Sequence, residues 1–121
     1  MNDKKLLGRW GEERAAEYLH GKRYRIVGQN FSCRFGEIDL IAENRAYLAF
    51  VEVKLRKNAA FAQAREFVTA AKQQKLIASC DFWLTRNPTD KQPRFDVIEI
   101  YGPHGAAGDI RINHIENAFE V

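Results

Sequence analysis

Residues 36–56 read GEIDLIAENRAYLAFVEVKLR and predict a β-hairpin. The strands are expected at residues 35–43 and 47–56, because both segments are rich in apolar β-branched and aromatic side chains. Between them, Asn44-Arg45 carries the turn signal. Each expected strand is apolar apart from a few charged positions, so the placement of those charges decides what the hairpin can do.

The register of the hairpin decides which charged side chains share a face. With a loop of two or four residues, Asp39 is expected opposite Phe50, which makes Asp39 and Glu52 diagonal neighbours on one face. Side chains alternate along a strand, so Lys54 is expected on the face of Glu52. A loop of odd length would separate Asp39 from Glu52, unless a bulge restored the register. The other face is expected to be apolar and to carry Ile38, Leu40, Ala42, Val51, Val53 and Leu55.

Two carboxylates on an otherwise apolar strand pair need a reason, because an unpaired carboxylate is costly to remove from water. Phosphodiester hydrolysis gives each group a use. Carboxylate oxygens hold Mg²⁺, which polarises a phosphate and acidifies an attacking water, and a lysine orients that water or stabilises developing charge. The alternative is a solvated sheet face with a pair between Glu52 and Lys54. Acids around an empty metal site repel one another, so Asp39 or Glu52 is expected to have a raised pKa unless Lys54 offsets it.

Composition indicates a single globular domain over residues 1–121, since 45% of the residues are hydrophobic and 29% are charged. The net charge of +3 fits a nucleic-acid partner, but only weakly. The two cysteines, Cys33 and Cys80, form no C-x-x-C motif and have no histidine nearby in sequence, which argues against a zinc site. The sequence shows neither an apolar run of membrane length nor a signal peptide, so a cytoplasmic protein is expected.

The rest of the sequence predicts further elements around the hairpin. We expect a helix from Asn2 or Asp3 to about His20, a strand at 24–31, a helix at 61–84 and closing strands at 94–101 and 110–115. A strand that joins the same sheet after the second helix implies a crossover, and therefore a mixed sheet flanked by helices. This α/β order, αβββαβ with a C-terminal strand, is that of the restriction-endonuclease-like core. Buried side chains are expected at Leu7, Tyr18, Ile38, Leu40, Val51, Val53, Phe67 and Val97.

Four stretches resemble the YraN family of small bacterial proteins: GEERAA at 11–16, GEIDLI at 36–41, FVEVK at 50–54 and RFDVI at 94–98. The resemblance extends to Lys72, His114-Ile115 and Ala118-Phe119, and so covers nearly the whole chain. That family is regarded as related to archaeal Holliday junction resolvases and to nucleases with the PD-(D/E)xK motif. The resemblance implies this fold more firmly than it implies an activity.

On this resemblance, Asp39 and Glu52 match the metal-binding acids of the motif and Lys54 matches its lysine. The carbonyl of Val53 would be a further metal ligand. Ile38 stands where the motif name has proline, at a position that varies widely among such nucleases. The implied cofactor is Mg²⁺ or Mn²⁺.

Residues outside the hairpin complete the candidate site. Glu12 looks like the glutamate that resolvases carry on the first helix, and helical spacing favours it over Glu13, which falls on the expected solvated side. The alternative for Glu12 is an ordinary surface acid. Arg56, Lys72 and Gln73 are expected to contact DNA phosphates, or else to form a solvated polar face.

Two function classes remain. The first is a metal-dependent endonuclease acting on structured or branched DNA, since a small domain without an obvious reading helix has little means of reading sequence. The second is a non-catalytic nucleic-acid-binding or partner-binding protein on the same fold. Asp96 is expected to pair with Arg94 or to cap the sheet edge, not to bind a metal. The oligomeric state stays open, with a homodimer as one alternative.

Overall fold

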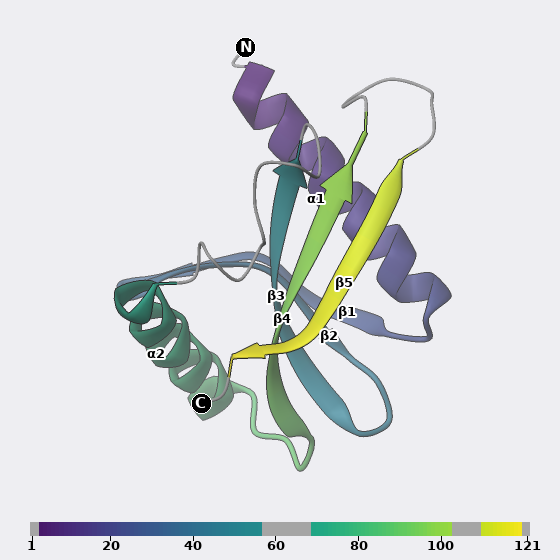
Figure 1. Ribbon diagram of the computed structural model, residues 1–121. Helices are drawn as coiled ribbons and strands as arrows, with labels where there is room; N and C mark the ends of the chain where they lie inside the picture. Colours follow the sequence, from purple (N-terminus) through teal and green to yellow (C-terminus); the bar gives the residue numbers. More distant parts are fainter. Residues whose placement is uncertain (1–2, 57–68, 103–109, 120–121) are drawn as a thin grey trace.

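The computed structural model describes residues 3–56, 69–102 and 110–119, with side chains described from residue 8 onward (Figure 1). Two helices and five strands follow one another in the order that the sequence predicts. Their bounds are α1 Asp3–Gly21, β1 Arg25–Cys33, β2 Gly36–Glu43, β3 Tyr47–Arg56, α2 Ala70–Arg86, β4 Gln92–Tyr101 and β5 Arg111–Phe119. The part of the second helix predicted before residue 69 lies outside the described residues.

The strands form one mixed sheet in the order β1-β2-β3-β4-β5. Neighbouring strands are antiparallel except β3 and β4, which are parallel. Parallel neighbours require a crossover, and the chain between β3 and β4 includes α2. The protein is therefore of the α/β class, with a mixed central sheet and two helices packed on it, as the sequence predicts.

The β2–β3 hairpin has a register two positions away from the expected one. Ile41 is the partner of Phe50, so the predicted pairing of Asp39 with Phe50 is wrong. The side chain of Asn44 explains the shift, because its Oδ1 accepts hydrogen bonds from two backbone N–H groups of the turn, at 3.0 and 2.8 Å. These bonds move the turn one residue further along the chain. A shift of two positions does not by itself change the face on which a side chain lies.

Helix α1 covers one face of the sheet and α2 covers the other (Figure 1). The cluster under α1 contains Ala15, Leu19, Tyr24, Leu40, Ala42, Ala49, Val51, Ile98 and Ile100. The cluster under α2 contains Ile38, Ile41, Leu48, Phe50, Leu76, Cys80, Phe95 and Val97. Because both faces of the sheet are buried, a charged side chain on either face must be paired or lie near an edge.

Six of the predicted core residues have described side chains, and four of these are buried: Ile38, Leu40, Val51 and Val97. Ile38 is buried under α2, not on the face of Leu40 as predicted. On the neighbouring strand, between the partners of Leu40 and Ile38, Asn30 has a left-handed conformation with φ 49°. Tyr18 and Val53 are half-buried. The side chains of Leu7 and Phe67 lie outside the described part of the protein.

Neither described helix is both long and apolar enough to cross a membrane.

Candidate active site

Asp39 and Glu52 lie on adjacent strands of the hairpin, on the face that α2 covers. Together they line an open pocket of about 270 Å³, whose other walls are Gly36, Glu37, Lys72, Lys75 and Leu76. The register explains why the two acids lie side by side. The β2–β3 ladder ends at the pair of Leu40 with Val51, and Asp39 and Glu52 are the next residues on their strands. The predicted placement of both acids on one face is therefore found.

The carboxylate of Glu52 is held between two lysines. Its Oε1 lies 3.1 Å from Lys54 Nζ, on the same strand, and 2.6 Å from Lys72 Nζ, on α2. The Glu52 side chain is only 17% exposed. Burial by itself would raise the pKa of Glu52, but the two ammonium groups outweigh it and hold the pKa below its usual value. Glu52 is therefore ionised at neutral pH.

Asp39 has a different environment. Burial is the largest influence on its pKa, and the charges of Glu52 and Glu12 act in the same direction, so that the pKa of Asp39 is raised to about 6. A hydrogen bond from the Val53 N–H to Asp39 Oδ2, at 2.9 Å, only partly opposes this shift. The expectation that one of the two acids has a raised pKa is met, and Asp39 is that acid.

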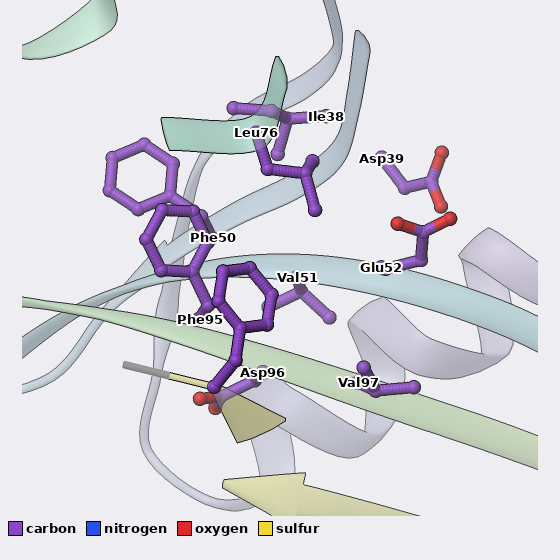
Figure 2. Close-up of a pocket in the computed structure, with 10 residues that line it drawn as sticks. Ile38, Asp39, Phe50, Val51, Glu52, Leu76, Phe95, Asp96 and Val97 are labelled. Atoms are coloured by element: carbon purple, nitrogen blue, oxygen red, sulfur yellow. The ribbon is translucent and has the colours of Figure 1, made fainter. Parts of the chain in front are cut away.

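The two acids also border a small cavity of about 10 Å³. It lies between the two carboxylate-bearing strands and the apolar core under α2, lined by Ile38, Asp39, Phe50, Val51, Glu52, Leu76, Phe95, Asp96, Val97 and Phe119. Figure 2 shows the carboxyl groups of Asp39 and Glu52 turned toward each other beside these apolar side chains. A volume of about 10 Å³ is at the lower limit of what holds one water molecule, so there is little room for solvent behind the acids.

The donor set suits a hard divalent cation. Within the described residues, Asp39 Oδ1 and Glu52 Oε2 take part in none of the hydrogen bonds, while the other oxygen of each carboxylate accepts from Val53 N–H or from lysine. Two carboxylate oxygens are thus left for a ligand, which is a set that Mg²⁺ binds together with waters. The described residues include no group of three acids, histidines or cysteines that could hold a metal. A site here would rely on two carboxylates.

Glu12 stands apart from the pocket of Asp39 and Glu52. It is half-buried on α1 and lines a separate pocket of about 390 Å³ that also contains Asn30 and Leu40. Its charge nevertheless contributes to the raised pKa of Asp39, so the two acids are electrostatically linked. Glu13 is exposed, as predicted. The roles predicted for Glu12 and for the Val53 carbonyl stay predictions.

The three polar residues expected to contact DNA have partners within the protein. Lys72 binds Glu52, as described above, and sequence reasoning missed this contact because it depends on how α2 packs across β3. Arg56 lies with its Nε 3.4 Å from Glu99 Oε2, and Glu99 is almost fully buried. Gln73 is half-buried in the first turns of α2. Glu37 lines the wall of the pocket.

Asp96 belongs to a second buried polar group, away from the pocket opening. Arg94 donates two hydrogen bonds to its carboxylate, both at 2.8 Å, which confirms the expected pair. His114 Nε2 lies 2.7 Å from Asp96 Oδ2, and Tyr18 and Tyr24 extend the network. Burial would raise the pKa of Asp96, but these partners keep it below its usual value. The network joins β4, β5 and α1, and the link to His114 has no signal in the sequence.

Comparison with known proteins places the chain among bacterial relatives. Residues 11–100 match the model of the uncharacterised protein family UPF0102. A UPF0102 protein of Caldanaerobacter subterraneus subsp. tengcongensis is 42% identical over 118 residues, covering 97% of each chain. One from Geobacter sulfurreducens is 44% identical over 120 residues, covering 97% of this chain and 91% of the relative. One from Geotalea daltonii is 42% identical, covering 99% and 94%. The matched region includes both pocket acids and both lysines.

Proposed function

The chain belongs to the uncharacterised protein family UPF0102, and from its site we propose that it is a metal-dependent nuclease that hydrolyses phosphodiester bonds in DNA. One observation carries the proposal. The carboxylates of Asp39 and Glu52 face one another at an open pocket, with the ammonium groups of Lys54 and Lys72 beside them. Binding alone gives no reason to place two acids against an apolar core, because their desolvation costs free energy.

Mg²⁺ or Mn²⁺ is the proposed cofactor. Asp39 and Glu52 would hold it through the two carboxylate oxygens that lack hydrogen bonds in the described structure, with the Val53 carbonyl as a third protein ligand. When bound, the ion polarises the scissile phosphate and lowers the pKa of an attacking water. The raised pKa of Asp39 supports a metal at this position, since a nearby cation would favour the ionised carboxylate that burial disfavours.

The protein's own side chains would do the rest of the chemistry. Lys54 is 24% exposed and lies beside Glu52, where its ammonium group can hold the attacking water or stabilise the charge that develops on the phosphate. Lys54→Ala should therefore keep metal binding and lose turnover. Arg56, Lys72 and Gln73 are proposed to bind backbone phosphates, Lys72 at the pocket itself. The proposed substrate is structured or branched DNA.

The non-catalytic alternative has one observation in its favour. Glu52 is already neutralised by Lys54 and Lys72, so the protein satisfies this acid without a metal. A nucleic-acid-binding or partner-binding protein on the same fold could keep such a cluster as a structural ion pair. Metal binding separates the two functions, because a purely structural cluster gains nothing from a divalent cation.

A panel of DNA substrates tests the proposal. Linear, flap and four-way-junction DNAs would be incubated with the protein in Mg²⁺, in Mn²⁺ and in EDTA, beside the variant Glu52→Ala. We expect cleavage of at least one branched substrate in the presence of metal, and none in EDTA or with Glu52→Ala. Cleavage at the same rate by Glu52→Ala would mean that a contaminant is responsible and that the proposed site is wrong.

A further inference from the structure

The turn between β1 and β2 carries an exposed aromatic ring next to the candidate active site. Arg34 and Phe35 form this turn, between the paired residues Cys33 and Gly36. Phe35 is 37% exposed, and within the described residues only Tyr47 is a comparably exposed large hydrophobic side chain. Gly36 has φ 152°, a conformation that favours glycine and holds the turn in this shape. A single exposed apolar side chain needs no explanation, so the significance of Phe35 depends on the side chains that surround it.

Phe35 belongs to a cluster of aromatic rings and arginines. Its ring lies 6.2 Å from that of Phe82 on α2, in an edge-to-face arrangement. The guanidinium of Arg34 lies over the Phe35 ring, 4.8 Å from its centroid. Arg86 lies over the Phe82 ring in the same way, at 3.8 Å. We call these four residues, Arg34, Phe35, Phe82 and Arg86, the aromatic platform.

The platform and the pocket of Asp39 and Glu52 lie along the same helix, α2. One stripe of α2, with the helical spacing of three and four residues, carries Lys72, Lys75, Ser79, Phe82 and Arg86. Its first two members line the pocket and its last two belong to the platform. From position 72 to position 82 the helix rises about 15 Å. A nucleic-acid strand whose phosphate lies in the pocket can therefore reach the platform within a few nucleotides.

We propose that the aromatic platform stacks an unpaired base, so that the protein selects DNA with a single-stranded segment. Aromatic rings and guanidinium planes both carry stacked bases, and unstacked bases are available only outside a regular duplex. The charges favour nucleic acid over a protein partner, since Arg34 and Arg86 lie against the rings and two further cations of the α2 stripe, Lys72 and Lys75, line the pocket. Two acids lie near these cations: Glu37 lines the pocket with Lys72 and Lys75, and Asp81 is exposed on α2 next to Phe82 in sequence. The inference rests on the proposed function only for the position of the phosphate in the pocket.

Binding of DNA without cleavage tests the platform. The probe is a single-stranded oligonucleotide with one 2-aminopurine, whose fluorescence falls when the base stacks, measured in EDTA at fixed salt. We expect the parent protein to quench this fluorescence. Phe35→Ala should abolish the quenching and weaken binding roughly tenfold, as expected for the loss of one stacked base. Phe35→Trp should restore both, while binding of a blunt duplex of the same sequence should not change.

The matched control is Tyr47→Ala. Tyr47 is 38% exposed and has an arginine, Arg94, 4.5 Å from its ring centroid, but it lies at the opposite end of the sheet from the pocket. The Tyr47→Ala variant should bind the oligonucleotide and quench its fluorescence as the parent does. Phe35→Leu separates the loss of stacking from a loss of folding, because leucine keeps an apolar contact with Phe82 but has no ring. This variant should have the melting temperature of the parent and still fail to quench the fluorescence.

Three results would overturn the inference: absence of single-strand binding by the parent, equal behaviour of Phe35→Ala and Tyr47→Ala, or a change in oligomeric state as the only effect of Phe35→Ala. The last would mean that the platform binds protein. If the parent quenches the fluorescence but cleaves no DNA in any metal, base stacking by the platform is supported and the nuclease proposal is refuted. Metal-dependent cleavage that Phe35→Ala retains on every DNA would refute the platform and leave the nuclease intact.

Discussion

The carboxyl group of Asp39 is expected to limit the stability of the metal-free protein. Its pKa is raised from 3.8 to about 6, first by burial and then by the charges of Glu52 and Glu12. A raised pKa means that folding favours the neutral form of Asp39. The folded protein is therefore most stable, as far as this group is concerned, below pH 4, and it loses that stability as the pH rises through 6 and Asp39 ionises. Glu52 behaves in the opposite sense, because Lys54 and Lys72 favour its ionised form.

Asp39→Asn should therefore stabilise the protein at pH 7 to 8 in EDTA, by about 1–3 kcal/mol. An asparagine keeps an oxygen that can accept the hydrogen bond from Val53 and carries no charge to desolvate. The gain should shrink as the pH falls from 7 to 4. Urea unfolding across this pH range measures both effects. A variant that is equally stable or less stable than the parent at pH 8 contradicts the assignment of Asp39 as the strained acid.

At the scale of elements, the hairpin and the helices were predictable to different degrees. The strands and their faces follow from a local pattern of apolar residues, so the shared face of Asp39 and Glu52 could be predicted. The register could not, because it depends on the hydrogen bonds of the Asn44 side chain. The contact of Lys72 with Glu52 joins α2 to β3 across 20 residues, and no local pattern encodes such packing.

Asn44→Ala tests the cause of the register. The variant loses both hydrogen bonds to the turn, and we expect it to be less stable by about 1 kcal/mol. Hydrogen exchange of the β2 and β3 amides should accelerate more than that of β4. Asn87→Ala is a comparison, since Asn87 also uses its side chain to bind backbone, at the end of α2, without touching the hairpin. Equal protection of β2 and β3 in both variants would show that Asn44 does not fix the turn.

At the scale of the whole molecule, the buried group around Asp96 ties the C-terminal strand to the rest of the sheet. Asp96 contacts Arg94 on its own strand and His114 on β5, and all three side chains are less than a tenth exposed. Asp96→Asn removes the charge that offsets Arg94. It should cost roughly 2–4 kcal/mol of stability. The exposed acid Asp90 provides the control, because Asp90→Asn should change the unfolding midpoint little.

Divalent metal should stabilise the fold as a whole, because a ligand that binds only the native state shifts the unfolding equilibrium. The melting temperature of the parent should rise with increasing Mn²⁺. The rise should disappear in Asp39→Asn and in Glu52→Gln, which each lack one ligand charge, and persist in Lys54→Ala. Calorimetric scans at several Mn²⁺ concentrations give the comparison. A similar rise in all four proteins would place the metal elsewhere.

The most direct test of the nuclease compares two glutamates of the same sheet. Glu52 and Glu43 are 17% and 16% exposed, and each is paired with two basic side chains, but only Glu52 lines the pocket. Cleavage of a four-way-junction DNA in Mn²⁺ would be followed under single-turnover conditions for the parent, Glu52→Gln and Glu43→Gln. We predict that Glu43→Gln cleaves like the parent and that Glu52→Gln does not cleave. Equal rates for the two variants, or a parent that is inactive on every DNA of the panel, would contradict a catalytic site at Asp39 and Glu52.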